Sequence, residues 1–267
     1  MSLSRAFKLI GLYARVNIQN LAAYRFDMYM RIVVSILHLI SELMGVWIIF
    51  SNTKEVRGWT WMHMLVLVGV YRTVAGGIRI AIVPSMRKLL EDIREGTLDF
   101  VLLRPVNAQF LVSIREVVIY RLVDVMLGLG IAAVGCYKLT GTVPVQHVIL
   151  FAFTLAAGFL IVYGVWLMLG TLCFWFIRVQ NIEMVFWNVF EAGRFPIDIY
   201  RTSIRWTLTY IVPLAFITTV PARALFSSDM SAAPTTIAWG FVLATMMLFV
   251  SNRFWRYGLR HYSGASA

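Results

Sequence analysis

Charged residues are scarce in this chain of 267 residues, where aspartate, glutamate, lysine and arginine together make up only 14%. Hydrophobic residues make up 60%, and the mean hydropathy is +0.77. A soluble domain of this size needs more charge than this to cover its surface. The composition therefore excludes an ordinary soluble protein and indicates that lipid surrounds much of the chain.

Sequence patterns of common enzymes and nucleotide-binding proteins are also absent. The chain has no G-x-x-x-x-G-K-[ST] loop, so we expect that it does not bind ATP in the usual way. It has no G-x-S-x-G elbow and no H-E-x-x-H motif, and its four histidines are scattered: His38, His63, His147 and His261. We therefore expect neither a catalytic site nor a metal site.

Only two cysteines are present, Cys136 and Cys173, and both lie in or beside apolar runs. They offer no metal-ligand spacing, and two cysteines are too few for a disulfide framework. The N-terminus lacks a short apolar core followed by a small-residue cleavage site, so we expect no signal peptide.

Long apolar runs are what the chain does contain. Several reach the roughly 20 residues that a helix needs to cross a bilayer, and they are continuous rather than alternating. We therefore predict an all-α integral membrane protein with about six transmembrane helices, near residues 28–50, 61–83, 117–137, 148–177, 206–225 and 235–250. Pro84 is expected to close the second span.

The N-terminal segment, residues 1–27, is too polar to span a membrane. Over residues 3–21, apolar side chains fall on one helix face and polar ones opposite: Leu3, Phe7, Ile10, Ala14, Ile18 and Leu21 against Arg5, Lys8, Arg15 and Gln19. This pattern predicts either an amphipathic helix in the cytoplasmic interface or an extension of the first span.

The rest of the chain divides by composition into paired spans and polar segments. The pairs are 28–84, 115–177 and 206–252, and between and after them lie a charged loop, 85–114, a connector, 178–205, and a basic tail, 253–267. The connector is interrupted by Gly193 and Pro196. We expect it on the cytoplasmic side or, over residues 182–195, as a short re-entrant piece.

The distribution of lysine and arginine predicts the orientation. The N-terminal segment, the charged loop, the connector and the tail hold four, four, four and three of them, whereas the opposite loops hold four: Lys54, Arg57, Lys138 and Arg223. Fifteen against four predicts that both termini are cytoplasmic. Because the basic residues cluster at span ends, the net charge of +11 does not indicate nucleic acid as a partner.

The charged loop begins with an amphipathic pattern. A narrow apolar stripe consists of Met86, Leu89, Leu90 and Ile93. The other sides carry charge, and Gly96 supplies a C-terminal stop: Arg87, Lys88, Glu91, Asp92, Arg94 and Glu95. The pattern is typical of a short helix that receives force from a soluble partner, and equally of a solvated loop helix.

Three groups of residues resemble one known family. The run G-T-L-D-F-V-L-L-R-P-V-N at residues 96–107 resembles the loop after the second span in ABC-transporter permeases of the ABC-2-like exporter type. The runs F-P-I-D-I-Y at 195–200 and P-L-A-F at 213–216, followed by Pro221-Ala222, are similar to later landmarks of that family. The resemblance covers nearly the whole chain, from the N-terminal helix to the basic tail.

The resemblance implies a half-transporter in the cell membrane of a prokaryote. Two such permeases pair, alike or with a sister chain, and each docks a separate ATPase that carries the ATP and magnesium; no cofactor is expected on this chain. Residues 85–95 would form the coupling helix, beside the N-terminal helix, with the ATPase contact at Met86, Leu89, Leu90, Ile93, Arg94 and Glu95. The cargo is not implied, although the basic cytoplasmic face would suit an amphiphile with an anionic head group.

Seven ionisable residues fall inside or near the predicted spans: Arg31, His38, Glu42, Arg72, Arg79, Arg121 and Asp124. A lone charge at the bilayer centre costs roughly 2.5–3.5 kcal/mol, so these side chains must face a partner or a wet cavity. One interpretation is a substrate path or gate lined by the first three spans. The other is a set of internal ion pairs, such as Arg72 with Glu42 or Asp124, and we favour it for Arg121 with Asp124.

Prolines and glycines in the later spans predict local features. Pro213 and Pro221 favour a kink in the fifth span, where four threonines either offer hydroxyls to a path or bond their own backbone: Thr207, Thr209, Thr218 and Thr219. Three glycines in the fourth span favour close helix contact: Gly158, Gly164 and Gly170.

Two other functions stay open from the residues alone. One is an ATP-independent carrier, although we find no inverted repeat and the chain is small for that design. The other is a non-transporting scaffold or a membrane enzyme.

Overall fold

The computed structural model describes residues 25–176, 181–227, 231 and 233–262. Over these residues the chain is helical, with no strand beyond an isolated bridge between Val56 and Trp59. The all-α prediction is therefore confirmed. The predicted amphipathic helix at residues 3–21 lies outside the described part of the chain.

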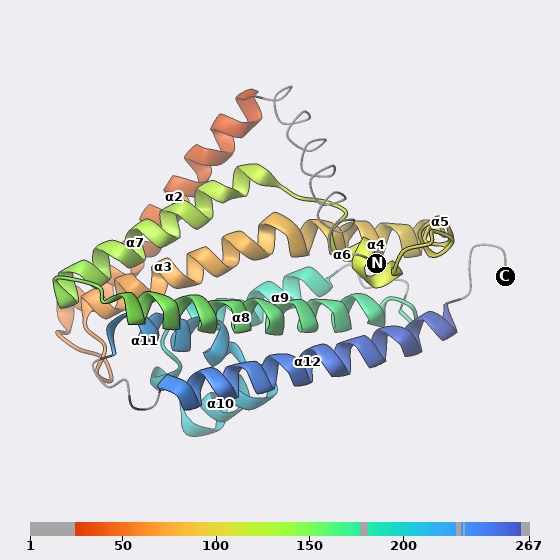
Figure 1. Cartoon of the computed structure of the whole chain (residues 1–267). Helices are drawn as coiled ribbons and strands as arrows, with labels where there is room; N and C mark the ends of the chain where they lie inside the picture. Colours follow the sequence, from red (N-terminus) through yellow and green to blue (C-terminus); the bar gives the residue numbers. More distant parts are fainter. Residues whose placement is uncertain (1–24, 177–180, 228–230, 232, 263–267) are drawn as a thin grey trace.

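Long helices lie side by side, with shorter elements among them and at one end (Figure 1). In chain order the elements are α2 (Arg25–Asn52), α3 (Trp61–Gly77), the π-helix η1 (Ile78–Ile82), α4 (Val83–Glu95), α5 (Asp99–Leu102), α6 (Ala108–Ser113), η2 (Ile119–Arg121), α7 (Leu122–Thr140), α8 (Val145–Leu172), α9 (Ile182–Glu191), η3 (Ala192–Arg194), η4 (Ile197–Ile199), α10 (Thr202–Trp206), the π-helices η5 (Thr207–Ile211) and η6 (Ala215–Thr219), α11 (Val220–Phe226) and α12 (Ala233–His261).

Five helices among the described residues are long and apolar enough to cross a membrane: Tyr29–Asn52, Trp61–Glu95, Ile119–Thr140, Val145–Leu172 and Pro234–His261. They correspond to the predicted first, second, third, fourth and sixth spans. A bent pair of shorter helices is a sixth candidate. The chain is therefore a multi-pass membrane protein, as predicted.

The second span does not end at Pro84, contrary to the prediction. Elements α3, η1 and α4 form one continuous helix of 35 residues. Proline lacks the N–H that would bond the Ile80 carbonyl, but that carbonyl accepts a hydrogen bond from the Val118 N–H at 2.7 Å instead. At about 1.5 Å per residue the helix is about 52 Å long, against about 30 Å for the hydrocarbon core, so part of it projects from the membrane.

Helices α3 and α7 approach each other backbone to backbone at the centre of the core. A Cβ added at Gly69 would lie 2.5 Å from the Gly128 carbonyl oxygen and 2.5 Å from the Ala132 nitrogen. In lipid, where no hydrophobic effect drives helices together, small residues allow this kind of close packing. The pair is the framework against which α2 and α9 position their polar side chains.

Replacing Gly128 by valine should force α3 and α7 apart. The new Cβ would meet the Gly69 oxygen and the Thr73 nitrogen at 2.6 Å, which requires the backbone to move. We expect the free energy of unfolding to fall by about 1–3 kcal/mol. Gly130→Val is the matched control on the same helix, because nothing lies within 4 Å of a Cβ added there. Equal thermal unfolding midpoints for the two variants in detergent would contradict the contact.

Helices α8 and α12 run side by side in the same direction. Ala157 faces Gly240, and seven residues further along both helices Gly164 faces Met247. Because the two helices are parallel, the chain must cross the membrane once between them. The predicted close contacts of the fourth-span glycines are confirmed, since a Cβ added to each would lie within 3.3 Å of another helix: at Gly158, Gly164 and Gly170.

The crossing between α8 and α12 is made by the segment from α9 to η4. Near its start Glu183 binds Arg87, and near its end Asp198 accepts a hydrogen bond from the Trp59 indole at 3.2 Å. Trp61 and Arg87 lie about 39 Å apart along their helix. The connector therefore runs the length of α3 and α4. The predictions that it stays on the cytoplasmic side, or enters as a re-entrant piece, are wrong.

The helices predicted as the fifth span form a re-entrant hairpin instead. The helix of α10 and η5 and the helix of η6 and α11 are bent by 76° at the break that contains Pro213, so the predicted kink is confirmed. Arg205 near the start of the hairpin and Arg223 near its end both pair with Asp198. Both ends of the hairpin therefore lie at the same end of the bundle, and a single span over these residues is excluded.

The threonines of the hairpin mostly bond their own backbone. Thr207, Thr209 and Thr218 each donate to the carbonyl four residues earlier, whereas Thr219 accepts a hydrogen bond from the Ile197 N–H at 3.3 Å. For these first three threonines, the alternative in which the hydroxyl bonds its own helix backbone is therefore correct. Because Arg201 and Arg205 lie with Asp198 at the end opposite α4, the lysine and arginine count becomes eleven in the N-terminal segment, charged loop and tail against six at that end, and it still favours the predicted orientation.

Candidate functional site

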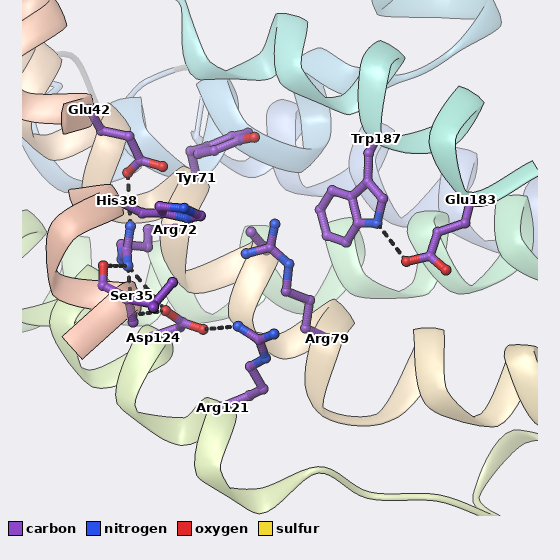
Figure 2. Close-up of a pocket in the computed structure, with 12 residues that line it drawn as sticks. Ser35, His38, Glu42, Tyr71, Arg72, Arg79, Arg121, Asp124, Glu183 and Trp187 are labelled. Carbon is purple, nitrogen blue, oxygen red and sulfur yellow. Dashed lines mark hydrogen bonds and ion pairs between the residues drawn. The ribbon is translucent and has the colours of Figure 1, made fainter. Parts of the chain in front are cut away.

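A polar cavity of about 290 Å³ lies among α2, α3, η1, α7 and α9 (Figure 2). Its lining contains all but one of the intramembrane ionisable residues identified from the sequence: His38, Glu42, Arg72, Arg79, Arg121 and Asp124. It is completed by Val34, Ser35, Tyr71, Ala75, Glu183 and Trp187. A polar cavity of this kind is what charges within a membrane require.

Arg72 is the centre of the buried ion pairs. Its NH1 lies 3.0 Å from Glu42 Oε2, and its NH2 lies 3.1 Å from Asp124 Oδ1. NH2 also donates to Ser35 Oγ at 2.7 Å. The side chains of Arg72 and Asp124 are 7% and 4% exposed. The two pairs named as alternatives from the sequence are therefore both formed, and they join α2, α3 and α7.

Asp124 has two further partners. Arg121 NH1 lies 3.2 Å from Asp124 Oδ2, and Ser35 Oγ donates to Asp124 Oδ1. Arg31 is the one predicted residue outside the cavity lining, and its NH1 donates to the Tyr120 hydroxyl at 3.1 Å. The polar face of the first span is thus bound to the start of the third.

Arg79 occupies a different environment on the same helix. It lies in the π-helical turn η1, and such turns are frequent at functional sites. Its guanidinium carbon lies 4.4 Å from the centroid of the Trp187 ring. Among the described residues, no carboxylate lies within ion-pair distance of Arg79. Figure 2 shows its side chain between the Arg72 cluster and Trp187.

Helix α9 is bound to α4 by a bidentate ion pair. Arg87 Nε and NH2 each lie 2.6 Å from a different oxygen of Glu183. Glu183 Oε1 also accepts a hydrogen bond from the Trp187 indole at 3.3 Å. Arg87, Glu183, Trp187 and Arg79 therefore form a continuous set of contacts from α4 to the cavity.

The sequence did not identify Tyr71, Glu183 or Trp187 as members of this site. The prediction of a cytoplasmic or re-entrant connector did not place its side chains beside those of the first three spans. The sequence signal that could have placed the connector against the bundle is an aromatic stripe at helical spacing: Phe186, Trp187 and Phe190. In the structure Phe190 stacks on Tyr71, with ring centroids 4.9 Å apart.

The apolar stripe of the predicted coupling helix faces the chain's own core. Met86 and Leu89 are buried, with 1% and 0% of their surface exposed, and Leu90 and Ile93 pack partly buried against the core. Leu89 lies against Gly170 of α8. The prediction that Met86 and Leu89 contact a partner is therefore wrong, because helix packing within the chain already covers them.

Asp92 holds the loop after α4 in place. Its backbone carbonyl accepts hydrogen bonds from the N–H groups of Thr97 at 2.9 Å and Leu98 at 3.2 Å, while its buried carboxylate binds Arg115 and the Thr97 hydroxyl. Gly96 ends α4 in the left-handed conformation, at φ 71°, as its predicted role as a helix stop requires.

The outer surface of this loop is apolar. Phe100 and Leu103 are 70% and 80% exposed, and Arg104 and Pro105 follow them at the surface. Arg94 and Glu95, also predicted to contact the ATPase, are exposed at the end of α4. The sequence run G-T-L-D-F-V-L-L-R-P thus builds a fixed loop in which Leu98 and Val101 are buried while Phe100 and Leu103 point outward.

Comparison with known protein families identifies the family of this chain. A model of the family described as ABC-2 family transporter protein matches residues 36–266. The match covers most of the chain and confirms the resemblance seen in residues 96–107. A search of the curated proteins found no match.

Proposed function

The chain belongs to the ABC-2 transporter family, and from that premise we propose that it is the permease half of an ATP-driven exporter. It pairs with a second permease, and each permease docks a separate ATPase. The printed sequence contains no phosphate-binding loop for ATP, so the energy has to come from another chain. Magnesium and ATP would be bound by that partner.

The exporter would lie in the cell membrane of a prokaryote with both termini of this chain in the cytoplasm. Eleven lysines and arginines in the N-terminal segment, the charged loop and the tail, against six at the end of the bundle opposite α4, support this orientation. In this orientation α4, α5 and the end of α12 lie on the cytoplasmic side, where an ATPase is available.

The observation that carries the proposal is the projecting loop at the end of α4. A helix about 52 Å long extends beyond the hydrocarbon core to Glu95, and the segment that follows it exposes Phe100 and Leu103. Large apolar side chains gathered on a solvent-exposed tip are typical of a protein contact. We assign the ATPase contact to Phe100, Leu103 and Arg104, with Arg94 and Glu95 beside them.

Force on this tip would reach the cavity through rigid contacts. Asp92 and Arg115 hold the loop against α4, and Leu89 holds α4 against α8. The continuous helix then leads to Arg72 and Arg79 in the cavity. ATP-driven closure of the two ATPases would therefore move α3 together with its tip, change the cavity between the first three spans, and release cargo outward.

The first test is gentle purification of the tagged chain from its native membrane, followed by mass spectrometry of the accompanying proteins. We expect a stoichiometric chain that carries G-x-x-x-x-G-K-[ST]. If the chain is recovered alone despite mild detergent, and it transports in vesicles without ATP, the exporter proposal fails in favour of an ATP-independent carrier.

The double variant Phe100→Ser and Leu103→Ser should lose the ATPase while its fold is retained. Both side chains are mostly exposed, so their removal costs little folding energy but removes the apolar contact. Val145→Ser is the control, because Val145 is 72% exposed at the opposite end of the bundle. The readout is the amount of co-purified ATPase at equal yield of permease. Retention of ATPase by the double variant would refute the assignment of the tip.

A further inference from the structure

Among the residues that the structure describes, the ion pairs around the cavity leave one positive charge without an anionic partner. Seven ionised side chains belong to this network: Arg72, Arg79, Arg87, Arg121, Glu42, Asp124 and Glu183. Every carboxylate among them has an arginine within 3.2 Å. Four guanidinium groups thus face three carboxylates, and the guanidinium left over is that of Arg79.

Arg79 is held in an orientation that keeps its donors available. The Trp187 ring lies over its guanidinium at 4.4 Å, and Trp187 is fixed in turn by its hydrogen bond to Glu183. A guanidinium stacked on an aromatic face keeps its N–H groups in its own plane, where they can donate to another acceptor. The side chain is half-buried and lines the cavity, so those donors reach its interior.

The chemistry of this site fits a phosphate group. The planar fork of arginine binds two phosphate oxygens at once, and one phosphodiester carries the single negative charge that the network lacks. Arg121 and His38 line the same cavity and add donors beside Arg79. Basic pockets between membrane helices on the cytoplasmic side commonly bind lipid head groups in this way.

The cavity is large enough for a head group, and its edge meets the lipid-facing surface. Val34 lines the cavity and is 46% exposed, and its neighbour Leu37 on α2 is 57% exposed. An acyl chain attached to a bound phosphate would therefore lie along apolar side chains of α2. Of the five long helices, α2 and α12 are the two that the rest of the bundle covers least.

We propose that the cavity binds the phosphate group of an amphiphile, with Arg79 as its principal ligand and Arg121 and His38 beside it. This names the substrate class of the proposed exporter, and it rests on that function only for the transport step. Binding itself requires the cavity alone. The source of the phosphate is either a membrane lipid or a soluble phosphate ester, and the experiment distinguishes the two.

The test is native mass spectrometry of the delipidated full chain in a neutral detergent. The probes are phosphatidylglycerol and a galactosyl diacylglycerol with the same acyl chains, which lacks phosphate. We expect phosphatidylglycerol to bind at least about tenfold more tightly, the effect of a charged hydrogen-bonded pair. Arg79→Gln should abolish this preference. Arg256→Gln removes the same charge from an exposed position on α12 and should retain it.

Two further arms keep the proposal open to refutation. Arg79→Lys keeps the charge without the bidentate fork, so it should bind with an affinity between those of the wild type and Arg79→Gln even if the latter folds poorly. Competition by millimolar inorganic phosphate would identify free phosphate as sufficient, and its absence would identify the lipid as the ligand. Equal binding of the two lipids, or an undiminished preference in Arg79→Gln, overturns the proposal. This binding experiment contains no ATPase. Failure of the purification experiment to find an ATPase partner would therefore leave its result unchanged.

Discussion

Replacing Arg72 by methionine should lower the free energy of unfolding by about 3–5 kcal/mol, because it removes one partner from a buried ionic cluster. Glu42 would lose the arginine that lies 3.0 Å from its carboxylate. Asp124, only 4% exposed, would keep Arg121 but lose the contact at 3.1 Å. Glu42 would then have no charged partner and Asp124 only Arg121, so the cost exceeds the loss of packing.

The matched control for this substitution is Arg79→Met, two turns along the same helix. It removes the same side chain from the same cavity, but it leaves no carboxylate without a partner. We expect a stability loss of less than about 1 kcal/mol for this control. Thermal unfolding of both variants, followed by the loss of monodisperse protein in detergent, measures the difference.

A triple variant separates charge from packing. If Arg72→Met is combined with Glu42→Gln and Asp124→Asn, no unpaired charge remains, and most of the lost stability should return. Recovery would show that the ionic cluster is retained for a reason other than stability, such as the cavity it borders. A triple variant as unstable as the single one would mean that packing, and not charge, determined the effect.

Replacing Leu89 by aspartate should unfold the cytoplasmic end of the bundle rather than merely release a partner. Leu89 is fully buried, and its Cδ2 would lie 3.3 Å from a Cβ added at Gly170 of α8. Loss of a buried leucine costs about 2–5 kcal/mol, and an isolated carboxylate in its place adds to that cost. We expect a total loss above about 3 kcal/mol and a low yield of folded protein.

Phe100→Asp is the control for the aspartate substitution at Leu89. It introduces the same charge eleven positions later in the chain, where the original side chain is 70% exposed. We expect its stability to lie within about 0.5 kcal/mol of the wild type. If Leu89→Asp instead folded normally and lost only ATPase binding, the coupling surface would be the stripe predicted from the sequence.

The sequence was sufficient for the class of protein and for most of its spans. Runs of about 20 apolar residues have few alternatives to a membrane helix, because only lipid tolerates them. Resemblance in residues 96–107 indicated the family, and the family match over residues 36–266 confirms it. The positions of Arg31, His38 and Glu42, which are seven and four residues apart, also place these three side chains on one face of the first span.

Apolar patterns alone did not distinguish which face of a helix meets the core and which meets a partner. Met86 and Leu89 form the stripe of an amphipathic helix in either case, and only the position of α8 decides that they are buried. The apolar residues that stay exposed, Phe100 and Leu103, lie in and directly after α5, a single helical turn too short for an apolar periodicity to be recognised.

The sequence by itself therefore determined that lipid surrounds this protein, that its fold is helical, which family it belongs to, and that charges within its spans need partners. The tertiary structure alone decided which segments cross. The fifth crossing is built from short elements between Glu183 and Asp198, and the more apolar segment after it returns to the end where it began. Hydropathy cannot separate these two, because a broken crossing that is buried within protein needs no long apolar run. It is the same crossing that brings Glu183 and Trp187 to Arg79 and so completes the cavity.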